Sequence, residues 1–284
     1  MYQFIIYKIA QLLSLFLPLK AGYAIAGFLA RCQFYFSRKD RKIVSDNLEA
    51  VLNTRDEAAI RKVAKEVFVN FAKYLVDFFR FSRLTTEYIT KNVKLIGRDN
   101  LDTAIKRKKG VILLTAHIGN YELGGAAVSL LGYPFNAVAL DHKNKLVNNF
   151  FIRQRQTANI NVIPLGMALK RCYACLKRGE VLALLGDRDF LNHGLKMKFF
   201  GRDSLIPKGM AVLSLRVGAS VVPTFFIRLP DDTFELTFER PITCSDTDDT
   251  DGNTRLIMKR CIEVMERYIK KYPSQWYMFR NFWI

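Results

Sequence analysis

Apolar residues dominate the first 36 positions of the chain. Residues 2–17 form a nearly continuous apolar run that is broken by Lys8 and Gln11 and closed by Pro18, and a second run covers residues 21–36. The first run is short for a segment that crosses a bilayer perpendicularly, which needs about 20 residues. Both runs are expected to be helices, either buried in a core or lying in or on a membrane as a hairpin.

A basic cluster, residues 38–42, follows the second apolar run. Lys and Arg directly after an apolar segment are typical of the cytoplasmic side of a membrane. We therefore expect residues 1–36 to be a membrane-associated helical segment and residues 37–284 to form the main domain on the cytoplasmic side. A cleaved signal peptide is not expected, because the start has no basic region and no small-residue cleavage site follows.

The pattern of the main domain changes near residue 92. Residues 40–83 are expected to be helical, and a segment that begins at Asp56-Glu57 carries apolar positions three and four apart from Ile60 to Phe79. Short β-rich runs then alternate with helical stretches. The expected strands are 93–96, 111–115, 135–140, 160–163, 181–185, 221–226 and 233–238. The expected helices are 99–108, 121–131, 144–157, 167–178, 208–217 and 254–272. This alternation predicts an α/β fold with a mostly parallel central sheet and helices on both faces.

Composition adds a strong positive charge to this picture. Half of the residues are hydrophobic, and the formal net charge is +18. Such a charge favours polyanionic partners. Because zinc-finger, RNP and basic-heptad patterns are missing from the sequence, an anionic membrane or an acidic protein is expected rather than nucleic acid.

The five cysteines are scattered and odd in number, which argues against a disulfide framework. Cys172 and Cys175 form a lone CxxC on an expected helix, where a spacing of three places both thiols on one apolar face. A structural zinc site needs four ligands. No metal site is therefore expected here.

One of only three histidines occupies a promising position. His117 directly follows the strand expected at residues 111–115, and ligand sites of parallel sheets lie at the carboxyl ends of strands. Glu122 lies five residues later, where a turn could bring its carboxylate to the imidazole to fix the tautomer. No serine or cysteine is adjacent, so His117 would activate the hydroxyl of an acceptor. On spacing alone, a capping histidine beside an exposed glutamate remains an alternative.

Two further polar clusters lie at expected strand ends. Residues 187–190, Asp-Arg-Asp-Phe, could position a polar substrate, brace a catalytic residue or form a solvated turn with a salt bridge. Residues 201–209 carry Arg202, Ser204 and Lys208 close to an expected helix N-terminus, which is a favourable place for a phosphate.

Several blocks together resemble the bacterial lipid A late acyltransferases, the lauroyl and myristoyl transferases of the lysophospholipid acyltransferase-like superfamily. The central block, Thr115-Ala-His-Ile-Gly-Asn-Tyr-Glu122, is similar to the H-x4-D/E catalytic block of that family. The blocks that are similar elsewhere are residues 17–48, 144–155, 162–164, 186–189, 199–201 and 207–223. In the block at residue 144, Lys145 stands where the family often has proline.

The resemblance implies an enzyme that moves a fatty acyl group from the thioester of acyl carrier protein to a hydroxyl of a lipid A precursor. It implies that His117 deprotonates the hydroxyl while Glu122 holds the imidazole, without metal or redox cofactor. The substrate-binding residues expected from these blocks are Asn120, Arg155 (with Arg153 as the competing choice), Asp187, Asp189 and Arg202. The expected location is the cytoplasmic side of the bacterial inner membrane.

The acceptor is the least determined part of this prediction. Relatives with the same blocks acylate lysophospholipids, phosphatidylinositol mannosides or aminolipids, so these acceptors stay open. A non-catalytic binding module of the same fold and a nucleic-acid binder are the alternatives from other classes. The intact pair of His117 and Glu122 favours an enzyme.

Overall fold

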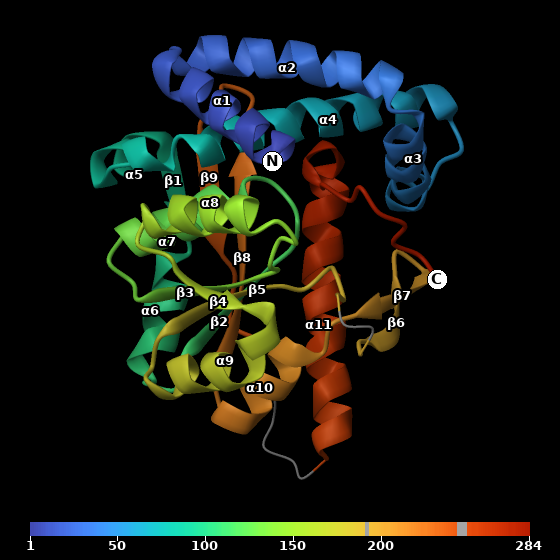
Figure 1. Ribbon diagram of the computed structural model, residues 1–284. Coiled ribbons are helices and arrows are strands. Elements are labelled where there is room, and N and C mark those ends of the chain that lie inside the picture. The colour runs from blue at the N-terminus through green and yellow to red at the C-terminus, as the bar shows by residue number, and fades with distance from the viewer. Residues whose placement is uncertain (191–192, 243–248) are drawn as a thin grey trace.

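The computed structural model describes residues 1–190, 193–242 and 249–284. A seven-stranded sheet in the order β1-β9-β8-β2-β5-β3-β4 forms its centre, as Figure 1 shows. The five strands from β8 to β4 are parallel to one another, whereas β9 is antiparallel to β8. The strands are β1 (Val93–Ile96), β2 (Val111–Thr115), β3 (Phe135–Ala139), β4 (Asn161–Pro164), β5 (Val181–Leu185), β8 (Ser220–Arg228) and β9 (Phe234–Phe238). The expectation of a mostly parallel central sheet is confirmed.

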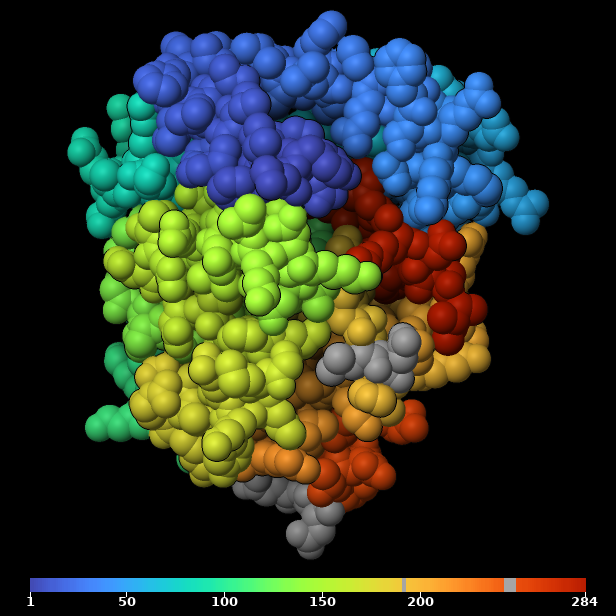
Figure 2. Space-filling model, viewed as in Figure 1, coloured from blue at the N-terminus to red at the C-terminus, as the bar shows by residue number. Residues whose placement is uncertain are grey.

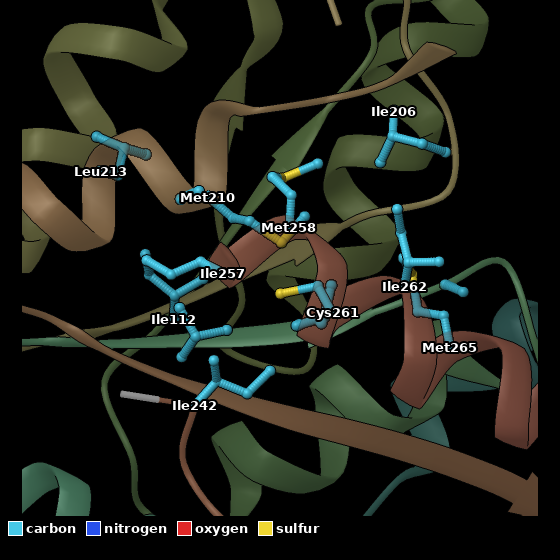
Figure 3. Close-up of a cluster of buried hydrophobic side chains, with 14 of the residues drawn as sticks. Ile112, Ile206, Met210, Leu213, Ile242, Ile257, Met258, Cys261, Ile262 and Met265 are labelled. Atoms are coloured by element: carbon cyan, nitrogen blue, oxygen red, sulfur yellow. The ribbon is translucent and has the colours of Figure 1, made fainter. Parts of the chain in front are cut away.

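Helices cover both faces of this sheet, as the apolar strands require. On β2, Val111 and Leu113 belong to one buried cluster and Ile112 and Leu114 to the other, because successive side chains point to opposite faces. The helices on the first face are α6 (Arg98–Lys106), α7 (Tyr121–Leu130) and α8 (Lys145–Gln156), and those on the second are α9 (Ala168–Lys177), α10 (Gly209–Val217) and α11 (Thr250–Lys271). Figure 3 shows the second cluster, where Met210 and Met258 meet beside Ile112.

The first 79 residues form four helices at one end of the sheet (Figure 1). These are α1 (Tyr2–Phe16), α2 (Leu19–Phe36), α3 (Arg38–Leu52) and α4 (Glu57–Phe79). The helix expected over residues 40–83 is interrupted, because Asn53 adopts a left-handed conformation (φ 48°) and the Asp56 side chain caps α4. Phe34, Leu48 and Phe68 form a third buried cluster, so α2 packs with α3 and α4.

The outer face of α1 and α2 is strongly apolar. Thirteen of the twenty large hydrophobic residues that are exposed in the described chain lie within residues 1–36, and Phe16 and Phe36 are 82% and 86% exposed. Figure 2 shows the blue N-terminal surface spread across one end of the molecule. Within the described ranges, no helix is both long and apolar enough to cross a membrane.

Smaller elements complete the chain, and the sequence pattern had not indicated them. Helix α5 (Thr86–Asn92) precedes β1, and strands β6 (Leu195–Phe199) and β7 (Arg202–Ile206) form a separate antiparallel hairpin. The 3-10 turns are η1 (Phe81–Arg83), η2 (Leu165–Met167) and η3 (Pro273–Gln275).

Candidate active site

A cavity of about 550 Å³ opens at the carboxyl ends of the parallel strands. This volume is in the range of small-molecule sites, and most of the wall is apolar. Its polar and charged lining residues include His117, Tyr121, Glu122, Arg155, Arg188 and Asp189. The apolar lining includes residues from both faces of the sheet, such as Gly125, Phe135, Ala137, Ile160, Leu184, Leu169 and Leu213. Leu140 and Leu169 are 49% and 68% exposed, so they lie at the rim.

Strand register brings His117 to Asp187. Strands β2 and β5 are neighbours, and Thr115 lies opposite Leu185. Because each of the two residues comes two positions after its strand, their side chains meet at the same edge. His117 Nδ1 lies 2.7 Å from Asp187 Oδ1, and both side chains are buried. A carboxylate can only accept, so Nδ1 carries the proton and Nε2 is the basic nitrogen of a histidine that lines the cavity.

Asp187 is held by two donors besides the imidazole. Its Oδ2 accepts from the backbone N–H of His117 at 2.9 Å and from Trp276 Nε1 at 3.0 Å. Burial alone would raise the pKa of Asp187, but the charge of His117, its ring and backbone hydrogen bonds and the charge of Arg188 lower it to about 2. Burial also lowers the pKa of His117, against the opposing effect of Asp187. The pair is therefore a neutral imidazole beside a carboxylate near pH 7.

Glu122 does not hold the imidazole, which corrects the expected hydrogen bond. Its carboxylate accepts from Arg155 Nη2 at 2.6 Å and from Nε at 3.0 and 3.1 Å. The two side chains are 11% and 14% exposed, and the guanidinium also lies over the Phe78 ring. The physical reason is that Glu122 lies in the first turn of helix α7, which packs on the same sheet face as α8, where Arg155 lies. The strand end of β5 places Asp187 nearer to His117.

The loop between β2 and α7 is fixed from two sides. Gly119 N donates to Gln275 O, and Asn120 N donates to Phe226 O. Gly119 has a φ of +62°, and a Cβ there would lie 2.0 Å from Phe226 O, so only glycine fits. Tyr277 N donates to His117 O at 2.8 Å, so the C-terminal segment lies against His117.

Asn120 serves this loop rather than the cavity. Its Oδ1 caps α7 by accepting from Leu123 N, and its amide donates to the buried carboxylate of Asp77 at 2.6 Å. The cap of α7 is thus Asn120 and not His117. Since Asn120 is 1% exposed and does not line the cavity, the structure gives it no contact with a substrate there.

The other expected site residues divide into two groups. Asp189 lines the cavity, where its Oδ2 accepts from Gly194 N. Arg202 lies in strand β7, pairs with Glu49 at 3.1 Å and does not line the cavity. In the same polar cluster, Lys208 directly precedes helix α10 and lines the cavity. Arg153 is exposed, whereas Arg155 is nearly buried, so only Arg155 belongs to the cavity.

Sequence reasoning missed two residues of the site. Trp276 comes from the last nine residues of the chain, and no local pattern connects it with Asp187. Arg188 was noted only as part of the run at residues 187–190 and not as a site residue of its own, and it lines the cavity. In the parts of the chain that the structure describes, no group of three or more His, Cys, Asp or Glu side chains could hold a metal ion.

A buried histidine–aspartate pair whose imidazole lines a largely apolar cavity is suited to moving an acyl chain onto a hydroxyl. The residues of the whole chain, 1–284, match the bacterial lipid A biosynthesis acyltransferase family, and the protein belongs to this family. It is therefore an acyltransferase that acts on a lipid acceptor.

Named relatives are distant. A phosphatidylinositol mannoside acyltransferase of Mycolicibacterium smegmatis is 23% identical over 219 residues, which are 76% of this chain and 70% of the relative. A lipid A biosynthesis acyltransferase of Haemophilus influenzae is 21% identical over 266 residues, 93% of this chain and 82% of the relative. Among solved structures, the 1-acyl-sn-glycerophosphate acyltransferase of Thermotoga maritima aligns with a TM-score of 0.41 at 16% identity, covering 87% of this chain and 97% of the other.

Proposed function

We propose that this protein transfers a fatty acyl group from the thioester of acyl carrier protein to a hydroxyl of a lipid A precursor, with His117 as the general base. The observation that carries the proposal is the His117–Asp187 pair at the cavity. The Nδ1 proton is bound to Asp187, so Nε2 is the nitrogen that can take a proton from a hydroxyl. The apolar wall of the cavity suits the acyl chain.

Each group in the proposed reaction has one task. Nε2 of His117 takes the proton of the acceptor hydroxyl, and the oxygen attacks the carbonyl carbon of the thioester. The carbon–sulfur bond of the resulting tetrahedral intermediate then breaks, and the leaving thiolate takes the proton from the imidazolium. Asp187 stabilises the imidazolium in between. Glu122 remains a proposed site residue that holds Arg155 against the cavity.

A membrane location follows in the proposal from the exposed face of α1 and α2. Apolar side chains on this face, such as Ile6 and Leu13, are 58% and 54% exposed and can enter an interface without spanning the bilayer. We place the protein on the cytoplasmic side of the bacterial inner membrane. Co-sedimentation with anionic vesicles should be lost when Ile6 and Leu13 are both changed to Asp, while the fold is retained. Unchanged sedimentation would contradict this part of the proposal.

The donor proposal relies on charge. Acyl carrier protein is acidic, and basic residues such as Lys170 and Arg171 are exposed beside Leu169 at the cavity rim. Opposite charges accelerate association and align the partners. The donor thioester would then reach the cavity across this rim.

The experiment that tests the function is acyl transfer with purified protein. Wild type and His117→Ala are incubated with acyl carrier protein loaded with fatty acids of different lengths and with an incompletely acylated lipid A precursor, and products are identified by mass spectrometry. The expected result is one added acyl group with wild type only. Equal product formation by His117→Ala would contradict the mechanism.

A second acceptor is favoured by one observation. Phosphatidylinositol mannoside acyltransferases are among the named relatives, so a mannosylated phospholipid is the alternative acceptor. The same assay with phosphatidylinositol mannosides separates the two. Transfer to the mannoside without transfer to the lipid A precursor would replace the first acceptor and retain the chemistry.

A further inference from the structure

Arg188 is a largely buried cation in the cavity wall, and it has no role in the proposed proton transfer. It follows Asp187 directly and lines the cavity together with His117 and Tyr121. The two carboxylates near His117 have other partners, because Asp187 pairs with the imidazole and Glu122 with Arg155. Among the residues that the structure describes, Arg188 forms no ion pair, and its Nε is buried without a hydrogen-bond acceptor.

Such a group is costly unless something pairs with it. A guanidinium remains charged at all physiological pH values, so it cannot escape burial by losing its proton. A buried donor of this kind without a partner is unfavourable. Burial lowers the pKa of Arg188, the charge of Asp187 opposes this effect, and the nearby Arg280 adds to it. Burial and charge together suit an anionic oxygen brought by a ligand.

The C-terminal segment fixes Arg188 relative to the catalytic base. Arg188 Nη2 donates to the carbonyl oxygen of Tyr277, and the N–H of the same residue donates to His117 O at 2.8 Å. The backbone of Tyr277 therefore holds both the Arg188 guanidinium and the backbone of His117. A cation held in advance beside the point of proton transfer is the arrangement that stabilises developing negative charge.

We propose that Arg188 forms an anion-binding subsite of the cavity, and that it donates to the thioester carbonyl oxygen as this oxygen becomes the oxyanion of the tetrahedral intermediate. The inference rests on the proposed acyl transfer. The phosphate of an acceptor headgroup offers the same anionic chemistry, so the experiment separates the two sources. The carbonyl oxygen is favoured because Arg188 and His117 share the same anchor and the same cavity.

The kinetic test compares Arg188→Gln and Arg188→Lys with wild type. Loss of one oxyanion donor lowers kcat by about 100- to 1,000-fold, so we expect such a fall in Arg188→Gln with both KM values within about threefold. Arg188→Lys, which keeps the charge, should retain more activity. The matched control is Arg216→Gln, on the exposed side of α10 and away from the cavity, which should behave as wild type.

Unchanged kcat in Arg188→Gln would overturn the proposal. A rise confined to the KM of phosphorylated acceptors would overturn the oxyanion assignment.

A binding test does not depend on acyl transfer. Dodecyl phosphate and dodecanol carry the same chain, but only the first brings anionic oxygens. Titration calorimetry should give wild type and Arg216→Gln at least tenfold tighter binding of dodecyl phosphate, and this preference should disappear in Arg188→Gln. Melting temperatures of all variants show whether each is folded. If the preference persists in folded Arg188→Gln, the subsite is refuted. If wild type shows the preference but transfers no acyl group, the proposed function fails and the subsite stands.

Discussion

Two carboxylates lie at the cavity in different ways, Glu122 in its wall and Asp187 behind His117, and their partners separate their roles. Asp187 is 0% exposed and binds both the ring and the backbone of His117, a residue whose charge can change during a reaction. Glu122 binds Arg155, whose charge is permanent. A carboxylate beside a permanent cation is already neutralised and can position a side chain, whereas one beside a neutral imidazole can stabilise charge as it forms. In the proposed reaction, Asp187 therefore stabilises the charge that forms on His117, and Glu122 positions Arg155.

The largest effect is expected from Asp187→Asn. The amide can donate a hydrogen bond to Nδ1, which favours the wrong tautomer and removes the charge that stabilises the imidazolium. Comparable changes in other enzymes lower kcat by about 10,000-fold, and we expect a loss of at least about 1,000-fold here. Steady-state kinetics of the transfer reaction measure it. If Glu122→Gln lost more kcat than Asp187→Asn, the division of roles drawn above would be wrong.

The second largest effect is expected on the free energy of unfolding when the ion pair between Glu122 and Arg155 is broken. Breaking a buried ion pair by removing one partner costs about 3–5 kcal/mol. Glu122→Gln and Arg155→Gln should therefore each lower the free energy of unfolding, and the double variant Glu122→Leu with Arg155→Met should regain most of the loss. Urea denaturation measures all three. Additive losses in the double variant would show that the two side chains do not depend on each other.

A third, smaller effect is expected in the pH dependence of kcat/KM for acyl transfer. The base must be neutral to accept a proton, and burial lowers the pKa of His117 below its ordinary value of 6.5. Activity should therefore persist as pH falls past 6.5 and decline only at lower pH. Asp187 raises the pKa of His117 and Arg188 lowers it. The acid limb of kcat/KM should thus move to lower pH in Asp187→Asn and to higher pH in Arg188→Gln. A shift of both variants in one direction would contradict these charge assignments.

The fold was predictable because it depends on local patterns. Residues 111–115 and 181–185 read as apolar strands, and both strands match the structure. The start of α4 at Asp56 and Glu57 was indicated by the sequence, but the end of α3 at Asn53 was missed, since a left-handed residue leaves little trace in an apolar rhythm. The hairpin of β6 and β7 was missed because charged residues interrupt its two five-residue strands, so neither contains a continuous apolar run.

The site was only half predictable, for a reason of topology. His117 and Asp187 were both recognised at strand ends, but their pairing depends on β2 and β5 being neighbours in the sheet. The sequence order of strands does not determine that, because β3 and β4 lie between them in the chain. The closeness of Glu122 in sequence suggested the wrong hydrogen-bond partner. Trp276 reaches Asp187, and Tyr277 reaches His117, only after the whole chain has folded back.

The smallest effect is expected from a substitution at Arg153, two residues before Arg155 in helix α8. Arg153 and Arg155 were competing choices for the arginine of helix α8, and the structure separates them by burial: Arg153 is exposed, and Arg155 lies against Glu122 and the Phe78 ring. An exposed substitution without a special contact changes stability by about 0.5 kcal/mol or less. Arg153→Gln should therefore keep the urea midpoint and the kcat of wild type, while Arg155→Gln loses stability in the same helix. A large loss of transfer activity in Arg153→Gln, with its stability intact, would move the functional arginine out of the cavity and onto the surface of α8.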